Sequence, residues 1–336
     1  MTGHERPLLA ITMGDPAGIG PEIILKALWS PDVFARSRPL VIGDRATMER
    51  AAGWVGIDNL RIEPVDDPAT GEYDPGTLPL LDLAAAPPDG YAVGVVSAAA
   101  GAAAVECVFR ACDLAMARAV DAVVTAPLNK AAMHAAGHTF PGHTELLAER
   151  TGATRVSMLL IGPSLRVVHV STHVALAEAI RRVTRQRVDE VIEIAYESCR
   201  MLGITEPRIA VAGLNPHASE GGLFGDEEAR EVIPAIGDAR ARGRNVSDPQ
   251  PPDTVFLRAT KGHYDIVVAM YHDQGHIPMK LLAFDSGVNV SIGLPIIRTS
   301  VDHGTAFDIA GTGVAAESSM LAAIDVAIQM AQAKQA

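Results

Sequence analysis

The chain has few cysteines, no long apolar run and no excess of positive charge, and each of these shortages excludes a class of protein. Its 336 residues include three cysteines, an odd number without a CxxC pair. This excludes a disulfide framework and favours free thiols in a reducing compartment. A formal net charge of -12 disfavours a general nucleic-acid binder, which would need a basic face. No run of about 18 apolar residues occurs, so a membrane-spanning helix is not expected.

The remaining composition is that of a globular protein. With 48% hydrophobic and 20% charged residues, a chain of this length can bury a large core without cross-links. The length predicts one large or two medium domains. The first seven residues carry charges and no apolar stretch, so no signal peptide is expected. We therefore expect an acidic cytoplasmic protein without nucleic-acid or membrane partners.

Short β-branched runs alternate with helical patterns along the chain. The runs that predict strands are 8–12, 39–42, 121–125, 165–170, 208–212 and 265–270. The helical patterns cover 22–29, 97–120, 186–203, 226–243 and the segment from 318 to the C-terminus. Apolar runs of this kind belong to a sheet covered on both faces, and their alternation with helices predicts an α/β fold. No long linker divides the chain, so two domains would require the chain to cross between them more than once.

A glycine-rich and proline-rich turn, GDPAGIGPE at 14–22, follows the first predicted strand. Pro21 suits the first position of a helix, and the N–H groups at a helix start attract anions. The spacing matches neither GxGxxG nor GxxxxGK. A ligand site and an ordinary strand-to-helix turn are therefore equal alternatives here.

Several later residues offer donors for an anion. Lys130, His143 and Thr144 suit a phosphate or a carboxylate, although Thr144 is also a natural cap for a helix over 145–150. Arg298 and Lys280 are cations in apolar surroundings, and each is expected to pair with either a protein carboxylate or a ligand. The turn at 303–306 is expected to open a helix whose backbone could meet the phosphates of a cofactor.

Three histidines, His173, His217 and His272, each follow a strand-like run. Because ligands gather at the carboxyl ends of strands in open α/β sheets, these imidazoles could converge on one divalent metal with an open coordination position. The alternative is that each is an ordinary hydrogen-bonded polar residue. Asp253 and Asp273 could orient ligands or move protons. The histidines without such a context, interpreted as structural or surface groups, are His4, His134, His138, His169, His263 and His276.

Together these segments resemble the 4-hydroxythreonine-4-phosphate dehydrogenase family from about residue 11 to the final helix. The matching segments are GDPAGIGPE at 14–22, TAPLNK at 125–130, PGHTE at 141–145, NPHA at 215–218, AMYHDQG at 269–275 and IRTSVDHGTA at 297–306. Each segment alone is weak, whereas their joint order and spacing are specific. One departure is that Asp248 precedes Pro249 where the family usually has glycine, and we expect only a local change because Asp253 and Thr254 are intact.

The resemblance implies the fold of isocitrate and isopropylmalate dehydrogenases, with two α/β domains and a cleft between them. The expected boundaries are 1–138 with 305–336 for the first domain and 139–304 for the second, which would carry the metal ligands and the dimer interface. Family members are homodimers with the active site at the subunit interface. They use NAD, or in some cases NADP, and a divalent cation such as Zn, Mg, Co or Mn.

The resemblance also implies roles for individual residues. The metal ligands would be His173, His217 and His272. The substrate-binding residues would be His143, Thr144, Lys280, Asn289 and Arg298, and the cofactor-binding residues would be Gly304 and Thr305. Lys280, acting in its neutral form near the cation, is the expected base for the substrate hydroxyl, with Asp253 and Asp273 as rivals.

The family contains two substrate branches. One oxidises 4-phosphooxy-L-threonine in pyridoxal phosphate synthesis, and the other oxidises D-threonate or D-erythronate 4-phosphate. The TMGDP opening at 12–16 and the YHDQGHIP segment at 271–278 look closer to the second branch. Both substrates are β-hydroxy acids with a terminal phosphate, so the expected reaction is oxidation by NAD followed by loss of carbon dioxide. The competing hypotheses are a metal hydrolase that uses the three histidines and a water, and a non-catalytic anion-binding protein.

Overall fold

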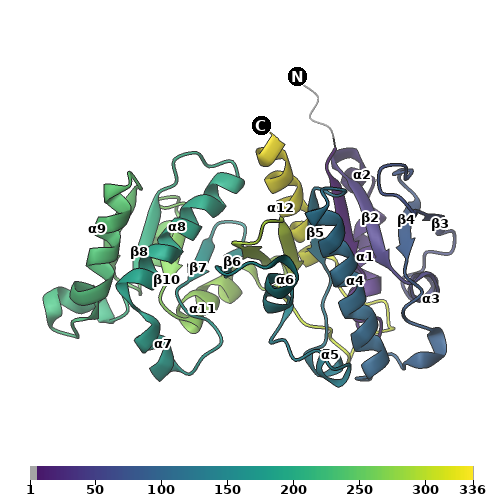
Figure 1. The fold of residues 1–336 in the computed structure, drawn as a ribbon, viewed down its shortest axis with the longest axis horizontal. Helices are drawn as coiled ribbons and strands as arrows, with labels where there is room; N and C mark the ends of the chain where they lie inside the picture. The colour runs from purple at the N-terminus through teal and green to yellow at the C-terminus, as the bar shows by residue number, and fades with distance from the viewer. Residues whose placement is uncertain (1–5, 336) are drawn as a thin grey trace. The chain divides into compact units, whose positions relative to one another are not determined.

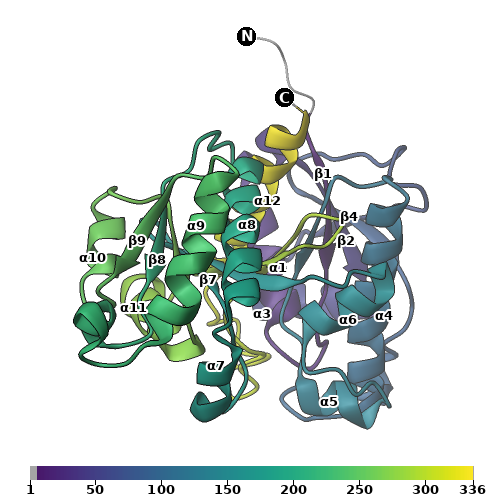
Figure 2. The ribbon, with the colours of Figure 1, turned by 60° about the vertical axis from the view of Figure 1, so that its left-hand side comes forward.

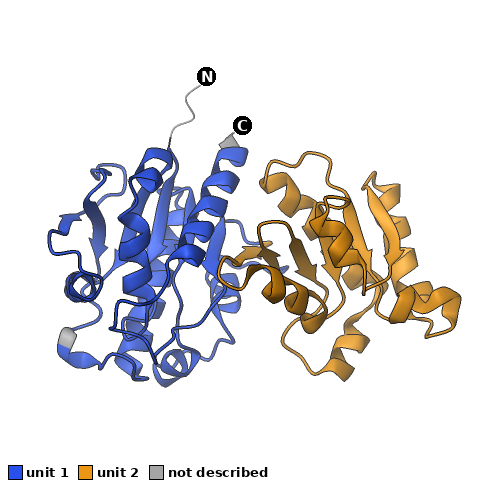
Figure 3. Ribbon diagram, turned by 180° about the vertical axis from the view of Figure 1, so that it is seen from behind, with its two compact units in different colours: residues 1–156, 294–336 blue, residues 157–293 orange. Residues whose placement is uncertain are grey.

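A computed structural model describes residues 6–335 of the chain (Figure 1). The chain divides into unit 1, formed by 1–156 and 294–336, and unit 2, formed by 157–293 (Figure 3). Both units are α/β, which confirms the predicted class. The boundaries differ from the expected 1–138 with 305–336, because α6 (His143–Thr151) packs on α4 (Ala98–Met116) and β12 (Arg298–Val301) pairs with β5 (Ala122–Thr125). His143, Thr144 and Arg298 consequently belong to unit 1 rather than to the second domain.

Unit 1 contains an all-parallel sheet in the order β3-β4-β2-β1-β5-β12. Its remaining strands are β1 (Leu8–Thr12), β2 (Arg38–Gly43), β3 (Arg61–Pro64) and β4 (Thr77–Asp82). All five residues of β1 are buried, because helices cover both faces of a parallel sheet. β1 and β5 end together, with Thr12 and Thr125 in register, so the loops that follow them start at the same edge.

The helices of unit 1 form two layers (Figure 2). One layer contains α4, which packs on the central strands, together with α5 (Lys130–Ala135) and α6; the other contains α1 (Gly20–Leu28), α3 (Arg45–Trp54) and α12 (Ser318–Gln335). The shorter elements of the unit are α2 (Pro31–Arg36) and η1 (Pro88–Gly90). Alanines on α4 allow it to approach β1, β2 and β5 closely, and Ser97 caps its start by accepting a hydrogen bond from the Ala100 N–H at 3.1 Å.

Unit 2 contains a mixed sheet in the order β11-β6-β7-β10-β8-β9. Its strands are β6 (Ser157–Ile161), β7 (Arg166–His169), β8 (Ile209–Ala212), β9 (Val246–Gln250), β10 (Ile266–Ala269) and β11 (Val288–Ile292). The strands β7, β10, β8 and β9 run parallel, whereas β6 pairs antiparallel with both β7 and β11. The carboxyl ends of β7, β8 and β10 therefore lie at one edge of the sheet.

Helices also cover both faces of the sheet of unit 2. They are α7 (Leu176–Arg182), α8 (Arg185–Met201), α9 (Ile233–Ala241), α10 (Val255–Thr260) and α11 (His272–Ala283), with the short elements η2 (Pro216–Gly222) and η3 (Glu228–Val232). A core cluster joins the sheet to α10 and α11 through Val167, Val267, Phe256 and Met279. This packing fixes the start of α11, where His272 lies, against β7 and β10.

Within residues 6–335, the structure has no helix that combines the length and the apolar character needed to cross a membrane. Cys107, Cys112 and Cys199 are free and buried, in agreement with the prediction that the chain has no disulfide framework.

Candidate functional site

Arg298 is the most deeply placed cation of unit 1. It begins β12 next to β5, its exposed fraction is 2%, and its Nη2 donates a hydrogen bond to Thr125 Oγ1 at 2.6 Å. Burial lowers the pKa of Arg298 to about 9, although the charge of Glu145 raises it in part. The guanidinium therefore remains charged at neutral pH. A buried positive charge is costly unless an anion accompanies it. This agrees with the expectation that Arg298 pairs with either a protein carboxylate or a ligand.

His143 faces the same cationic surroundings. It is the first residue of α6, and its Nε2 is buried without a hydrogen-bond partner among residues 6–335. Burial first, and then the positive charges of Arg298 and Lys130, hold the pKa of His143 well below its usual value. The imidazole is therefore neutral. A buried polar nitrogen beside two cations is suited to a bound anion, which would supply the missing partner.

Two local details of this region differ from the sequence predictions. Thr144 is not the cap of α6, because the helix begins at His143, two residues earlier than predicted, and Gly142 occupies the cap position. The turn at 14–20 is entirely buried, and the N–H groups of Asp15 and Ile19 donate to the carbonyls of Pro127 and Thr305. Since these N–H groups are already engaged, the structure favours the strand-to-helix interpretation of this turn over an anion site.

Asp15 in this turn is a buried acid that is not among the site residues predicted from the sequence. Its exposed fraction is 0%, and its Oδ1 accepts a hydrogen bond from the Ala17 N–H at 2.9 Å. Burial raises the pKa of Asp15 to about 6, although hydrogen bonds from the backbone of Ala17 and Asn129 oppose the shift. The available signal for its burial was its position shortly after the buried strand β1. Its residue type gave no such signal, because aspartate is usually exposed.

The turn at 303–306 does not open a helix, because Ala306 has a left-handed φ of 43° and the next helix, α12, begins at Ser318. Gly304 is exposed, and a side chain built there would meet nothing within 4 Å, whereas Thr305 is buried. The backbone at Gly304 is therefore accessible to a ligand such as NAD. The helix N-terminus that was expected to support the cofactor phosphates is not present at this turn.

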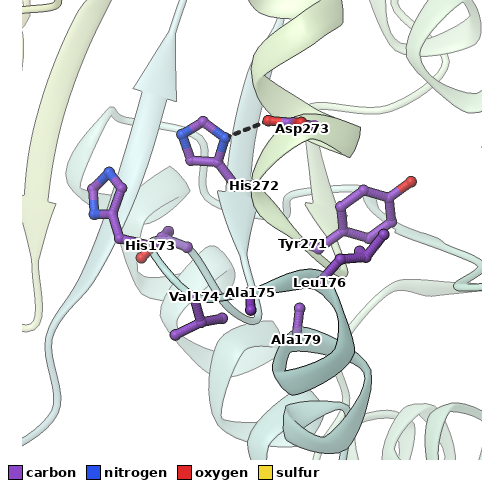
Figure 4. A pocket seen from close by; sticks show the side chains of 9 residues that line it. His173, Val174, Ala175, Leu176, Ala179, Tyr271, His272 and Asp273 are labelled. Atoms are coloured by element: carbon purple, nitrogen blue, oxygen red, sulfur yellow. Dashed lines mark hydrogen bonds and ion pairs between the residues drawn. The ribbon is translucent and has the colours of Figure 1, made fainter.

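In unit 2, His173 and His272 line one pocket of about 440 Å³ (Figure 4). His173 follows β7, His272 begins α11, and their ring centroids are 5.5 Å apart. The wall of the pocket is completed by Thr172, Val174, Ala175, Leu176, Ala179, Tyr271 and Asp273. His272 Nδ1 lies 2.7 Å from Asp273 Oδ1, which orients the ring and leaves Nε2 for a ligand.

His217 is not brought together with these two histidines. It lies on η2 beyond β8, its Nδ1 is 3.1 Å from Glu220 Oε2, and its ring contacts Phe224 edge-on. Within the described part of the chain, no three side chains of His, Cys, Asp or Glu are arranged to hold a metal ion. The donor types at His173 and His272 suit a divalent transition metal such as zinc. The three-histidine site itself stays a prediction.

Two further histidines, His169 and His276, belong to this cluster, although the sequence predicts them to be structural or surface groups. The ring of His276 stacks on that of His272 with centroids 3.6 Å apart, and His169 lies 4.8 Å from His276. Burial, and then the neighbouring imidazoles, lower the pKa of His169 to about 3, so it is neutral. A side chain at Gly275 would lie 2.3 Å from His169 Nε2, so only glycine fits there. The spacing of four residues between His272 and His276 on a helix was the available signal.

The remaining predicted residues of unit 2 lie on separate elements. Lys280 is on α11 with its Nζ 5.7 Å from the centroid of the Phe284 ring, and Asn289 is on β11. Asp253 is exposed between β9 and α10. Asp248, the departure from the family pattern, lies in β9 and forms an exposed ion pair with Arg240 at 2.8 Å.

Comparisons with known proteins agree on one family. A family model described as pyridoxal phosphate biosynthetic protein PdxA matches residues 35–327. The chain is 50% identical to a D-threonate 4-phosphate dehydrogenase of Cupriavidus necator, over 97% of each chain. It is 51% identical to a 4-hydroxythreonine-4-phosphate dehydrogenase of Desulfosudis oleivorans, over 98% of this chain and 97% of the relative. A crystal structure of 4-hydroxythreonine-4-phosphate dehydrogenase from Klebsiella pneumoniae superposes with a TM-score of 0.90 at 48% identity, covering 98% of this chain and 100% of that one.

Proposed function

The chain belongs to the pyridoxal phosphate biosynthetic protein PdxA family, and on that premise we propose that it oxidises and decarboxylates a four-carbon β-hydroxy acid with a terminal phosphate. The reaction would use NAD, or NADP, and a divalent cation. The relatives are named dehydrogenases, so the chain is an oxidoreductase by family. D-Threonate or D-erythronate 4-phosphate is the favoured substrate. Overall identity is nearly equal for relatives of the two branches, so it does not distinguish between the substrates. The choice is supported instead by the segments at 12–16 and 271–278, which look closer to the D-threonate branch.

The observation that carries this proposal is the cluster of positive and polar groups in unit 1 that contains Arg298, His143 and Lys130. Arg298 is nearly inaccessible to water, and His143 Nε2 is buried without a partner in the described residues. An unsatisfied buried polar atom costs about 1–3 kcal/mol, which a bound phosphate or carboxylate would recover. Arg298 would hold two oxygens through its planar guanidinium, and His143, with its proton on Nε2, would donate to a third. Thr144, in the first turn of α6, would be a further hydrogen-bond donor to the phosphate.

His173 and His272 would hold the cation, and Asp273 would keep the imidazole of His272 in the orientation that presents Nε2. The third ligand would be His217, once η2 changes conformation. Residues 217–220 are four consecutive non-glycine residues with left-handed φ angles, a conformation that costs roughly 1–2 kcal/mol per residue. Release of this strain supports a rearrangement of η2 on binding. The cation and NAD together would supply the polarisation of the substrate oxygen and the hydride acceptor.

Lys280 is the proposed base for the substrate hydroxyl, because it projects from the helix that begins with His272. It would accept the proton of the substrate hydroxyl as a general base. Asp273 is the rival on the same helix, although its side chain is 70% exposed and already bonded to His272. Asp253 is the second rival. Asn289 on β11 would bind the substrate, and Gly304 with Thr305 would bind NAD.

We also propose that the protein is a homodimer whose interface completes the site. The support is a row of exposed apolar side chains on α11 and its C-cap residue, where Ile277, Leu281 and the cap Phe284 are 57%, 82% and 73% exposed. Their spacing of four and three residues places them on one face of the helix. Because exposed apolar side chains gathered on one face mark interaction sites, a second copy of this chain is the proposed partner.

A side-by-side assay tests the function. Purified protein with NAD and a divalent metal is given D-threonate 4-phosphate, D-erythronate 4-phosphate or 4-phosphooxy-L-threonine, and NADH is followed at 340 nm. We expect the highest kcat/KM with one of the two sugar acid phosphates, together with release of carbon dioxide. Higher kcat/KM with the threonine derivative would assign the chain to the branch of pyridoxal phosphate synthesis. Metal-dependent hydrolysis without NADH would contradict the dehydrogenase proposal.

A further inference from the structure

We propose that Glu22 and Lys26 on α1 are positioning residues for the cofactor, because they hold the segment 311–315 in place and thereby set the affinity for NAD. This inference rests on the proposed function, in which Gly304 and Thr305 bind NAD. Neither Glu22 nor Lys26 touches that predicted binding turn directly. They act on the chain that follows it.

Glu22 is a fully buried carboxylate whose two oxygens are both used. Its exposed fraction is 0%, Oε1 accepts a hydrogen bond from the Gly311 N–H at 2.6 Å, and Oε2 accepts one from the Gly313 N–H at 2.8 Å. A buried charge is tolerated only when hydrogen bonds satisfy it, and bonds to charged groups are the stronger ones. The carboxylate thus fixes two N–H groups that lie two residues apart in the loop.

Lys26 lies one helical turn further along α1 and binds the same segment. Its ammonium is a hydrogen-bond donor, whereas the Glu22 carboxylate is an acceptor. Its Nζ donates to the carbonyl oxygens of Gly313 and Ala315, each at 2.6 Å. The carboxylate therefore binds N–H groups and the ammonium binds carbonyls of the same short segment. Four charge-assisted hydrogen bonds from two side chains define the position of the backbone of 311–315.

The loop has a geometry that depends on this support. Gly313 has a left-handed φ of 72°, and a side chain there would lie 2.1 Å from the Trp54 carbonyl oxygen. Gly311 also has a positive φ, at 82°. Because glycine loses more conformational freedom on ordering than other residues, a loop with two such positions needs external contacts to stay in one conformation.

The same end of α1 also holds the predicted cofactor turn. The Ile19 N–H donates to the Thr305 carbonyl at 3.1 Å, and a side chain at Gly18 would lie 2.9 Å from Thr305 Cβ. The segment 305–315 is therefore attached to α1 at both ends, by Ile19 at the first and by Glu22 with Lys26 at the second. Loss of the second attachment would let the segment sample several positions, and NAD would then have to order it on binding at a cost in affinity.

The test compares Glu22→Gln with the wild type. Gln keeps the size of the side chain but replaces one acceptor oxygen by an NH₂ donor, which would oppose the N–H of Gly311 or Gly313. We expect the dissociation constant for NAD, measured by calorimetry, and the KM for NAD to rise about tenfold, which is the size of effect that one lost bond to a charged group gives. The kcat at saturating NAD and the KM for the phosphorylated substrate should change less than about twofold, and amide hydrogen exchange should accelerate over 304–315.

Two controls separate positioning from general stability. Val191→Ala creates a cavity on α8 in unit 2, so it lowers stability without touching this segment. Glu49→Gln removes an exposed carboxylate of the same unit. The inference fails if the NAD affinity of Glu22→Gln equals that of the wild type, or if Val191→Ala weakens NAD binding as much. Should Glu22→Gln not fold, Lys26→Met removes the two carbonyl contacts and takes its place with the same expected results. A wild-type protein that binds no NAD would overturn the proposed function itself, together with this inference.

Discussion

Replacement of Arg298 by lysine separates a role in phosphate recognition from a role in stability. Arg298 is 2% exposed and donates to Thr125 Oγ1, so it is packed as tightly as a core residue. Lysine keeps the charge but lacks the planar fork that holds two oxygens at once. At most one of the two proposed bonds to the phosphate then survives.

The size of the effect follows from the number of bonds lost. A hydrogen bond to a charged group contributes about 1.5–3 kcal/mol, which corresponds to a loss of roughly ten- to 150-fold in kcat/KM for the phosphorylated substrate. The unphosphorylated substrate makes no such bond, so its kcat/KM should change little. The ratio of the two values should therefore fall by the same factor.

The assay measures kcat/KM with phosphorylated and unphosphorylated substrate for the wild type, Arg298→Lys and Thr125→Val, together with their melting temperatures. Thr125→Val removes the hydroxyl that accepts a hydrogen bond from Arg298 and serves as the stability control. We expect it to melt earlier while it keeps most of the preference for the phosphate. If Arg298→Lys behaves in the same way as this control, Arg298 is structural and the reasoning is refuted.

Four further predictions concern the rest of the site. His272→Ala should lose bound metal and turnover together, and metal analysis that finds stoichiometric metal would contradict the assignment. Leu281→Glu should shift the protein from dimer to monomer in sedimentation and reduce activity; an active monomer would refute the shared site. Burial raises the pKa of Asp15 from 3.8 to about 6, so the free energy of unfolding of the wild type should fall as the pH rises from about 4 through 6. Asp15→Asn should abolish this pH dependence and raise the free energy of unfolding at pH 7 by up to about 3 kcal/mol, as measured by denaturation at several pH values. Gly275→Ala should cost about 1–3 kcal/mol in the free energy of unfolding, because its methyl group would overlap the ring of His169, and an unchanged denaturation midpoint would show that the ring can move.

The strands and helices with clear apolar patterns could be predicted from the sequence. The segment 8–12 is β1 with the same bounds, and the helix expected from 318 onward begins at Ser318. In such segments the local pattern and the tertiary packing favour the same structure. The candidate site residues were predicted from sequence motifs, which assign both Arg298 and His143 to an anion. In the structure the charge of Arg298 acts on His143 and helps to lower its pKa.

Features set by backbone geometry or by distant contacts could not be predicted. The cap of α6 falls on Gly142 rather than on Thr144, because the path of the chain decides where the helix starts. The turn at 303–306 opens no helix, since Ala306 takes a left-handed φ that its residue type does not favour. The antiparallel pairing of β11 with β6 joins segments more than a hundred residues apart, and no local pattern encodes such a pairing.

The insertion of unit 2 into unit 1 has a consequence for synthesis on the ribosome. β12, which pairs with β5 and carries Arg298, emerges only after the whole of 157–293 has been made. At about 5–20 residues per second, that wait lasts on the order of ten seconds. During this time β5 lacks its β12 neighbour, and unpaired strand edges are sites of aggregation. A nascent chain that stalls within unit 2 would therefore expose this edge, and it would be a natural client for chaperones before Arg298 is in place beside β5.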